Sequence, residues 1–496
     1  MTKDSAQEVQ GGRESRGAGG GNWEEPAGGR GGEVKDGGGM VVGRKLGCGE
    51  CAYYWQRGMR AVMAAAKRAV LAAAVQVVLL AATKRAELTA AGSASNGGYA
   101  GCANGGYTDA GIYGGFDPPA TEELPDWLSD FSPSEVPQLT IPLLHQALRS
   151  APRGTAAGPS GWLIEHLRDT FLSYQSHLPH LLRLFQNWLQ GDLPQTVRPY
   201  FTASTLVALQ KPQGGVRPIA IGEILPRLLS RCVTLHFKQQ IRDFFLPSLQ
   251  FGVAVSAGIE VMAHAVQSAL SLHPEWVVLE LDVANAFNSF SRSAMFNALR
   301  DSPFSSLIPF FRLFYASPSS LHYRSGPLIE TLQSSSGVRQ GDPCGPFLFA
   351  LTQHLAIRPI QRQSPALFIT SYADDTYMVG PAHDVFPAYT ALTARLNNLG
   401  LRVQPSKCSL WAPLDLPSDL TPPSDIVIAP NGLTVAGVPI GSDTHIISTV
   451  RDKLHSFSSS LPLLHDLHDP QTASRLLTLC ISARPSFLLR TVAPFP

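Results

Sequence analysis

Apolar positions follow two different patterns from about Pro125 onward. Some segments repeat them with helical spacing, and others gather them in short β-branched runs, with Pro and Gly between the segments. This alternation predicts a mixed α/β body, in which residues 276–283 (WVVLELDV) form a mostly buried strand. Ser291 is a suitable N-cap for a helix that runs through Leu299. The residues after Gly441 are expected to be helical.

A β-hairpin is predicted further along the chain. Residues 367–372 and 376–379 are both strand-like, and only Ala373, Asp374 and Asp375 lie between them. Asp is an ordinary turn residue, so a pair of solvent-facing acids is one interpretation. Aromatic and aliphatic side chains on both arms favour the other interpretation, a hairpin packed in a core whose acidic tip is held rigidly.

The N-terminal part of the chain differs from the rest. Sixteen of the 44 glycines fall within the first 50 residues, so we expect residues 1–58 to be disordered, with Cys48 and Cys51 as free thiols rather than half of a zinc site. Residues 59–90 are rich in alanine and predict a helix. Its uncharged stretch is shorter than the ~20 residues of a membrane span, which favours a soluble or surface-lying helix over a membrane or targeting role. Residues 91–135 are expected to form a linker.

Composition narrows the classes of protein that remain. Hydrophobic residues make up 44% of the chain and charged residues 16%, which excludes a wholly disordered protein. Lys and Arg number 39 against 38 for Asp and Glu, so any basic surface must be local. The seven cysteines are odd in number and scattered, which argues against a secreted disulfide scaffold and fits a reducing compartment. We therefore expect an intracellular protein of the nucleus or cytoplasm.

Acidic residues stand at the ends of two of the predicted strands. Asp282 lies near the C-terminal end of the first strand, and Asp374 and Asp375 form the tip of the hairpin. Three carboxylates on neighbouring strands suit two divalent cations about 4 Å apart, the arrangement used for in-line phosphoryl transfer. Mg²⁺ prefers oxygen ligands and shares the phosphates of its substrate, so it is the expected ion, with Mn²⁺ as an alternative.

Seven segments between residues 140 and 441 carry recognisable motifs. In chain order they are AAGPSGWLIEHL (156–167), VALQKPQGGVRPIAIGE (207–223), LDVANAF (281–287), SGVRQGDPCGPFLFAL (336–351), YADD (372–375), LGLRVQPSKCSL (399–410) and VAGVPIG (435–441). Together and in this order they resemble the fingers and palm motifs of reverse transcriptases, especially those of non-LTR retrotransposons and group II introns. YADD alone is a weak signal, but the ordered set is specific.

The resemblance implies an α+β right-hand polymerase. Fingers and palm would cover residues 136–441, with an antiparallel palm sheet packed on helices, and residues 442–496 would form a partial helical thumb. The catalytic and metal-binding residues implied by the resemblance are Asp282, Asp374 and Asp375, with the carbonyl of Val283 as a further metal ligand.

Four more residues match nucleotide-binding positions of the family. Phe287 matches the residue under the incoming sugar, where a bulky ring would clash with a ribose 2′-OH. Gln340 matches a residue that contacts the nucleotide near its sugar, and Gly341 lets the backbone approach closely. Lys407 matches a lysine proposed to protonate the pyrophosphate leaving group, although it is equally consistent with an exposed surface charge.

Basic residues are concentrated in one part of the chain. Lys211 and Arg217 flank the turn at Gly214 and Gly215, where two cations on one hairpin could close over a triphosphate or simply remain solvated. Four more are expected on one helical stripe that follows a nucleic-acid backbone, unless that stripe is an exposed solubilising face. They are Arg227, Arg231, Lys238 and Arg242.

The chain also departs from the family. Cys344 stands where many relatives carry an apolar residue, and Asn285 where many carry an acid. We recognise no ribonuclease H segment and no endonuclease module, and the predicted thumb is short. The sequence is therefore expected to be a truncated copy or fragment of a mobile element.

The expected activity is RNA-directed DNA polymerisation. The enzyme would bind an RNA template and a DNA primer and add deoxynucleotides to the primer 3′-OH. A DNA template is also allowed. The alternatives are a catalytically silent nucleic-acid-binding remnant, a group II intron enzyme, which usually carries a maturase segment not found here, and an RNA-templated RNA polymerase. Ala373 before the paired acids and Phe287 argue against the last of these. No stable membrane association is expected, and the sequence does not fix the oligomeric state.

Overall fold

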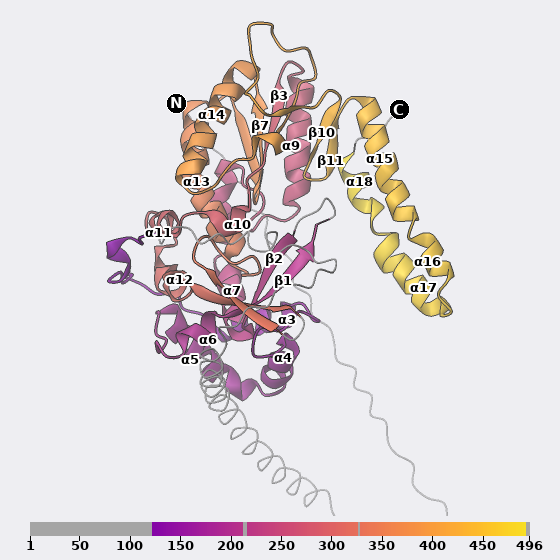
Figure 1. The fold of residues 1–496 in the computed structure, drawn as a ribbon. Coiled ribbons are helices and arrows are strands. Elements are labelled where there is room, and N and C mark those ends of the chain that lie inside the picture. Colours follow the sequence, from indigo (N-terminus) through magenta and orange to yellow (C-terminus); the bar gives the residue numbers. More distant parts are fainter. Residues whose placement is uncertain (1–121, 212–215, 326–327, 493–496) are drawn as a thin grey trace, which may run out of the picture. The chain divides into compact units, whose positions relative to one another are not determined.

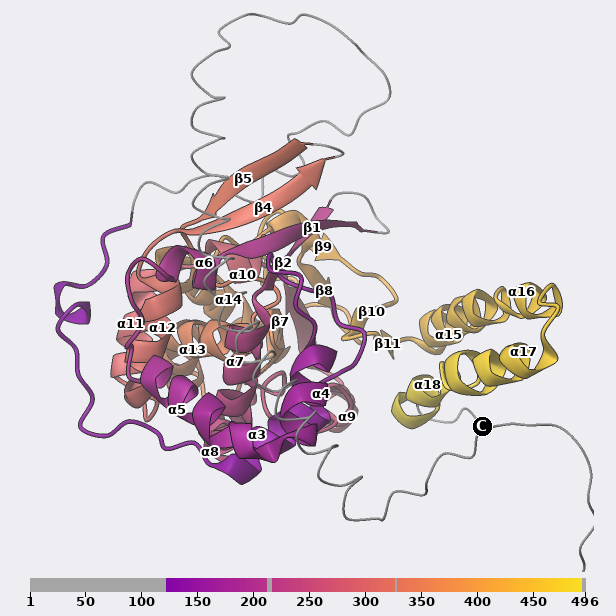
Figure 2. The same cartoon turned by 90° about the horizontal axis from the view of Figure 1, so that it is seen from below.

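The computed structural model describes residues 122–211, 216–325 and 328–492 (Figures 1 and 2). All of them belong to Tyr99–Pro496, the second of the two units into which the chain divides. The predictions for residues 1–58 and 59–90, the pair Cys48 and Cys51, and the first part of the predicted linker 91–135 lie outside the described residues, as does the turn at Gly214 and Gly215.

A five-stranded sheet forms the centre of this unit. Its strands lie in the order β6-β7-β3-β8-β9. The predicted strand and the predicted hairpin are both confirmed, as β3 and as β6 with β7. The expectation of an antiparallel sheet is wrong at one edge, because β8 and β9 run parallel. The strands are β3 (Val277–Leu281), β6 (Phe368–Tyr372), β7 (Asp375–Gly380), β8 (Ser409–Trp411) and β9 (Val427–Ile428).

Helices cover both faces of this sheet, which explains why β3 is apolar at almost every position. On one face, Val277 and Leu279 join the large core cluster together with α13 (Gly345–Gln363) and α14 (Ala382–Asn398). On the other face, Val278 packs in a second cluster with α9 (Gly258–Leu272). Figure 1 shows α9 on one side of β3 and β7, and α13 and α14 on the other. The alternation follows from the two-residue period of a strand.

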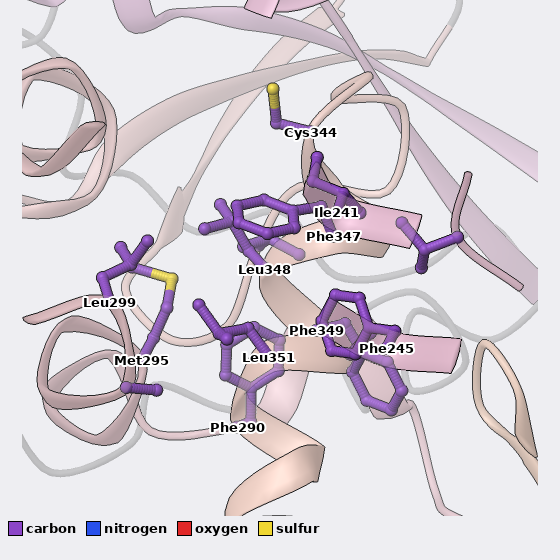
Figure 3. Packing of buried hydrophobic residues seen from close by; sticks show 14 of the residues in the cluster. Ile241, Phe245, Phe290, Met295, Leu299, Cys344, Phe347, Leu348, Phe349 and Leu351 are labelled. Atoms are coloured by element: carbon purple, nitrogen blue, oxygen red, sulfur yellow. The ribbon is translucent and has the colours of Figure 1, made fainter. Parts of the chain in front are cut away.

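Helix α13 is the main contributor to the large core cluster. Phe347, Leu348 and Phe349 are almost completely buried, and the rings of Phe245 and Phe347 lie 6.3 Å apart between centroids. Figure 3 shows these side chains interleaved with Met295 and others from neighbouring helices. Full burial of a large apolar side chain contributes about 1.5 to 3 kcal/mol, so the packing of α13 is a major source of stability for this unit.

A second sheet has the strand order β2-β1-β4-β5. Its first two strands form the antiparallel hairpin that the sequence predicts for residues 207–223, and β1 pairs with β4 in parallel. Gly158 lies so close to the end of this hairpin that a Cβ there would sit 2.6 Å from the Gly222 carbonyl oxygen. The strands are β1 (Ser204–Gln210), β2 (Val216–Gly222), β4 (Ser319–Ser325) and β5 (Leu328–Ser334).

The remaining helices of the body come before β3 and directly after it in the chain. Ser291 caps α11 as predicted, since its Oγ accepts a hydrogen bond from the Ala294 N–H at 2.9 Å. Glu122 also caps this helix, accepting from the Arg292 N–H at 2.9 Å. The helices are η1 (Asp126–Leu128), α3 (Ile141–Ser150), α4 (Ile164–Ser173), η2 (Gln175–His177), α5 (Leu178–Leu189), α6 (Arg198–Thr202), α7 (Ile224–His236), α8 (Lys238–Phe245), η3 (Leu246–Ser248), α10 (Ala286–Ser289), α11 (Arg292–Arg300), η4 (Ser305–Leu307) and α12 (Ile308–Tyr315).

The described residues after Gly441 are mostly helical, as predicted. A short hairpin precedes them, and an ion pair of 2.9 Å between Arg490 and Glu260 ties the last helix to α9. Among the described residues, none of the helices is long and apolar enough to cross a membrane. The elements are η5 (Pro405–Lys407), β10 (Gly432–Val435), β11 (Val438–Gly441), α15 (Asp443–Ser458), α16 (Leu461–His465), α17 (Pro470–Leu476), η6 (Leu477–Ile481) and α18 (Pro485–Thr491).

Candidate active site

The three predicted acids meet at one end of the central sheet. Asp282 directly follows β3, and Leu281 pairs with Thr376 of β7, so Asp282 stands opposite Asp375. Asp374 lies in the two-residue turn between β6 and β7. Two acids from one hairpin and one from the adjacent strand therefore come to the same edge.

The hairpin turn is strained at a residue other than glycine. Ala373 has φ of 54°, in the left-handed region that a tight two-residue turn demands. An alanine held there costs of order 1 to 3 kcal/mol, so the surrounding structure must enforce the turn.

Gln250 supplies that enforcement, and no motif or spacing in the sequence indicates this role. Its Oε1 accepts hydrogen bonds from the backbone N–H of Ala373 at 3.0 Å and of Gly252 at 2.9 Å. Its Nε2 lies 3.3 Å from the Ala373 carbonyl oxygen and 3.3 Å from Oε1 of Gln353. Gln353 in turn donates to Thr376 Oγ1 at 3.1 Å. Both glutamines are buried, so this amide network holds both ends of the acidic turn.

Glycine at position 252 permits this close approach. A Cβ there would lie 2.2 Å from the Ala373 nitrogen and 2.9 Å from the Tyr372 carbonyl carbon. The backbone before α9 thus packs directly against the backbone of the turn.

The strand end at Asp282 is held from the other side. Its carbonyl oxygen accepts a hydrogen bond from the Gln404 N–H at 2.9 Å, and its N–H points to Cys408 Sγ at 3.4 Å. Val283 pairs with Val403 in an isolated antiparallel bridge. The hydrogen bonds of this bridge are made by the flanking residues, so the pairing does not use the Val283 carbonyl.

Burial and mutual repulsion destabilise the negative charges at this site. Burial raises the pKa of Asp375 to about 6, and the charges of Asp374 and Asp282 add to the effect. Burial also raises the pKa of Asp282 and of Asp374. A fourth acid, Glu280, has its pKa raised to about 7 by burial and then by Asp375. A site that repels its own charges in this way favours a bound cation.

Oxygen donors of this kind fit a hard divalent ion. Within the described residues, however, no group of three or more His, Cys, Asp or Glu side chains is already arranged to hold a metal ion. The fit therefore rests on donor type and on the mutual repulsion of the acids.

Three basic side chains oppose this repulsion, and all three are site residues predicted from the sequence. Lys407 and Lys211 act to lower the pKa of Asp282, against the raising effect of its burial. Arg217 and Lys211 act in the same way on the pKa of Asp374. The β1–β2 hairpin thus directs two cations towards the acids, as expected if it closes over an anionic substrate.

Phe287 lies just beyond Asp282, in α10. Its half-buried ring packs at 4.9 Å between centroids from Phe349, and its carbonyl oxygen accepts from the Val338 N–H at 2.7 Å. The ring is therefore supported by the core of α13, which gives it a fixed position.

Gln340 and Gly341 pack against β2. The Gln340 carbonyl oxygen accepts from the Ala220 N–H at 2.8 Å. Gly341 has φ of 132°, and a Cβ there would lie 2.4 Å from the Ala220 carbonyl oxygen. The predicted close approach at this glycine is thus, in the structure, an approach to the backbone of β2.

Two buried arginines hold the loop around Gln340, and sequence reasoning missed both. Arg292 is 2% exposed and donates to the carbonyl oxygens of Gly337 at 2.9 Å and Ser334 at 3.1 Å. Arg339 is 6% exposed, donates to the Thr202 carbonyl and lies 5.2 Å from the Phe314 ring centroid. Each of these arginines stands among apolar residues in the sequence, and this could have indicated a buried role. A charge in such surroundings requires many hydrogen-bond acceptors.

The predicted basic stripe does not lie on one helix, so that expectation is wrong. Helix α7 ends at His236 and α8 begins at Lys238, which breaks the spacing. Arg227 and Arg231 donate to the backbone carbonyls of Ala156 at 2.8 Å and Ser150 at 2.6 Å. These two side chains anchor the segment before α4. Lys238 is exposed, and Arg242 is exposed in an ion pair with Asp243 at 3.3 Å.

Of the family departures, Cys344 behaves as a small buried group, as expected. It is 0% exposed, and burial raises the pKa of its thiol. Asn285 is exposed with φ of 47°, a conformation that asparagine tolerates better than most residues.

Comparison with known proteins gives a consistent result. Residues 209–440 match the family model described as reverse transcriptase (RNA-dependent DNA polymerase). The retrotransposable element SLACS 132 kDa protein of Trypanosoma brucei gambiense is 26% identical over 259 residues, which cover 51% of this chain and 21% of that protein. The Pol polyprotein from the type-2 retrotransposable element R2DM of Drosophila melanogaster is 24% identical over 273 residues, covering 52% and 24%.

The chain spans only about a fifth to a quarter of the length of these relatives. Among solved structures, a telomerase from Candida tropicalis matches 50% of this chain and 55% of its own at 12% identity, with a TM-score of 0.34, which is too low to equate the folds. The family match confirms the resemblance found in the sequence: residues 209–440 form a reverse transcriptase domain, and both relatives are named as proteins of retrotransposable elements.

Proposed function

We propose that this chain is an RNA-directed DNA polymerase that adds deoxynucleotides to a primer 3′-OH on an RNA or DNA template and releases pyrophosphate. The observation that carries the proposal is the convergence of Asp282 with Asp374 and Asp375 at one edge of the sheet, with Lys211 and Arg217 directed at them. Acids that repel one another beside cations from a separate hairpin suit a polyphosphate substrate bound through metal ions.

The proposed architecture is a right hand. The five-stranded sheet with α9, α13 and α14 corresponds to a palm, and the β1–β2 hairpin with the helices around it corresponds to fingers. Helices α15 to α18 correspond to part of a thumb. The domain boundaries at residues 136, 441 and 496 remain proposals.

Two Mg²⁺ ions are the proposed cofactors, with Mn²⁺ as a substitute. Asp282, Asp374 and Asp375 would hold them, together with the Val283 carbonyl, which its bridge to Val403 leaves unused. When bound, such ions lower the pKa of an attacking hydroxyl and neutralise charge on the phosphates. The protein's own contribution is a rigid acidic turn, fixed by Gln250.

The remaining side chains would orient the nucleotide. Lys211 and Arg217 would pair with its triphosphate, and Lys407, whose charge acts on Asp282, would stand near the leaving group. Phe287 would exclude a ribose 2′-OH, because its ring is braced by Phe349. Lys238 is exposed and would meet a nucleic-acid backbone, and Arg242 is exposed but already paired with Asp243, whereas Arg227 and Arg231 would act mainly through the segment that they anchor.

The proposed partners are an RNA template, a DNA primer and deoxynucleotides, and the proposed location is the nucleus or cytoplasm. Retrotransposon proteins are the curated relatives, which supports a template supplied by a mobile element.

Primer extension on poly(rA)/oligo(dT) tests this function. We expect extension by the full chain that requires Mg²⁺, stops on chelation by EDTA and falls at least about 1000-fold in Asp374→Asn, because the site loses a ligand charge. Asp419→Asn, an exposed acid in a loop, is the matched control and should extend normally. Nucleic-acid binding without extension by any variant would instead identify a catalytically silent remnant.

A further inference from the structure

A basic hollow lies along the second half of α13, apart from the acids. Its volume is about 440 Å³, and Phe244, His354, Arg358, Gln361 and Arg362 contribute to its lining. A smaller hollow of about 180 Å³ adjoins it and shares four of these residues. None of the three acids lines either hollow. We call the two together the α13 groove.

Two arginines in the groove are available to a ligand. Arg358 and Arg362 are exposed and lie one helical turn apart on α13. Within the described part of the chain, neither guanidinium has a hydrogen bond or an ion pair. This contrasts with Arg292 and Arg339, whose guanidiniums are buried and occupied.

Two acids, Asp243 and Asp301, also line the groove, and each is paired with a neighbour of its own. Asp243 accepts hydrogen bonds from Gln239 at 2.8 Å and pairs with Arg242 at 3.3 Å. Asp301 pairs with Arg300 at 3.1 Å. The positive charge of the two free arginines is therefore not cancelled locally.

His354 adds a buried polar group to the same wall. It is 9% exposed, its Nε2 has no hydrogen-bond partner among the described residues, and its ring packs 5.1 Å from that of Phe244. Burial lowers the pKa of His354 to about 4, and Arg358 and Arg362 add to the effect, so the ring is neutral at pH 7. An unsatisfied buried nitrogen is unusual, and a bound ligand or water at this wall would supply the missing partner.

One wall of the groove is tied to neighbouring segments by hydrogen bonds. Gln361 spans from α13 to two other segments, donating to the Ser248 carbonyl at 3.1 Å and to the Ile369 carbonyl at 3.0 Å. The binding surface is therefore preformed, which reduces the entropy lost on association.

We propose that the α13 groove binds the phosphodiester backbone of a single nucleic-acid strand, with Arg358 and Arg362 as the phosphate contacts. Two charges one turn apart suit a linear polyanion, and an aromatic wall beside them is typical of single-strand sites. The choice of nucleic acid over other polyanions rests on the proposed polymerase function.

The test is the binding of a labelled single-stranded oligo(rA) to the full chain, measured by fluorescence anisotropy across a salt series. Each phosphate contact to a single strand contributes about 0.7 to the slope of log K against log salt. Arg358→Ala with Arg362→Ala should therefore lower that slope by about 1.4 and weaken binding about 25-fold at 0.1 M salt, with the difference vanishing near 1 M. Arg358→Lys with Arg362→Lys should restore the slope.

Arg153→Ala with Arg183→Ala is the matched control, since it also removes two exposed charges. An unchanged slope in the groove pair, or an equal fall in both pairs, would overturn the proposal. So would loss of binding to phosphatidylserine vesicles in the groove pair without any effect on RNA. Primer extension by the same wild-type preparation distinguishes failure of the groove proposal from failure of the proposed polymerase function. Absence of extension would refute the polymerase function, whereas the salt slope alone tests nucleic-acid binding in the α13 groove.

Discussion

Replacing Gly252 with alanine should displace the turn that carries Asp374 without removing any acidic side chain. The added Cβ would lie 2.2 Å from the Ala373 nitrogen, and ordinary contacts begin at 3.4 Å, so the two backbones must separate by about 1.2 Å. Gly252 does not have a positive φ, so alanine suits its own conformation and the effect is purely one of contact. Both neighbours are backbone atoms, which cannot rotate away as a side chain would.

The consequence should appear in catalysis before it appears in folding. A separation of this size would break or lengthen the hydrogen bonds by which Gln250 holds Ala373 and would move Asp374 and Asp375 with the turn. A displacement of about 1 Å can cost about 100-fold in rate, and overpacking costs about 1 to 3 kcal/mol of stability. We expect kcat for primer extension to fall about 100-fold while the affinity for primer–template changes little.

The control is Gly345→Ala at the start of α13. A Cβ there would meet its nearest neighbour, the Arg339 carbonyl oxygen, at 3.5 Å, which is an ordinary contact. Its kcat and its melting temperature should both match the wild type. A Gly252→Ala protein that folds and keeps kcat within about threefold of the wild type would refute the close packing of these backbones as the support for the turn.

Three further predictions concern other residues of the structure. Phe287→Val should admit ribonucleotides in primer extension, because it removes the ring braced by Phe349, and unchanged sugar selectivity would contradict this. Arg292→Met should lower the free energy of unfolding by about 3 kcal/mol or more in urea titrations, because several buried carbonyls lose their donor, and a smaller loss would show that water replaces it. The depressed pKa of His354 means that the folded state favours its neutral form. The contribution of His354 to the free energy of unfolding is therefore complete above pH 6.5 and is lost as pH falls towards 4. Between pH 7 and pH 4 the free energy of unfolding should therefore fall by about 2 to 3 kcal/mol less in His354→Phe than in the wild type. Parallel curves of unfolding free energy against pH for the two proteins would contradict this.

Local patterns in the sequence were enough to predict the strands that carry the acids. The apolar run before Asp282 and the strand-like arms around Asp374 predicted β3 and the β6–β7 hairpin, because a two-residue period and a tight turn are properties of contiguous residues. The Ser291 cap was predictable for the same reason. The motifs and their order pointed to a reverse transcriptase, which the family match confirms.

Tertiary structure alone decided which groups hold these acids in place. Gln250 is 123 residues from Ala373, and the Arg292 donor is 45 residues from its Gly337 acceptor, so no local spacing connects them. The same is true of the basic stripe, whose spacing implied one exposed helical face. The fold instead breaks the helix at Phe237 and turns Arg227 towards Ala156, because an unsatisfied backbone carbonyl nearby attracts a guanidinium. Sequence periodicity records which face of an element is apolar, whereas the partner of each polar group depends on which elements meet.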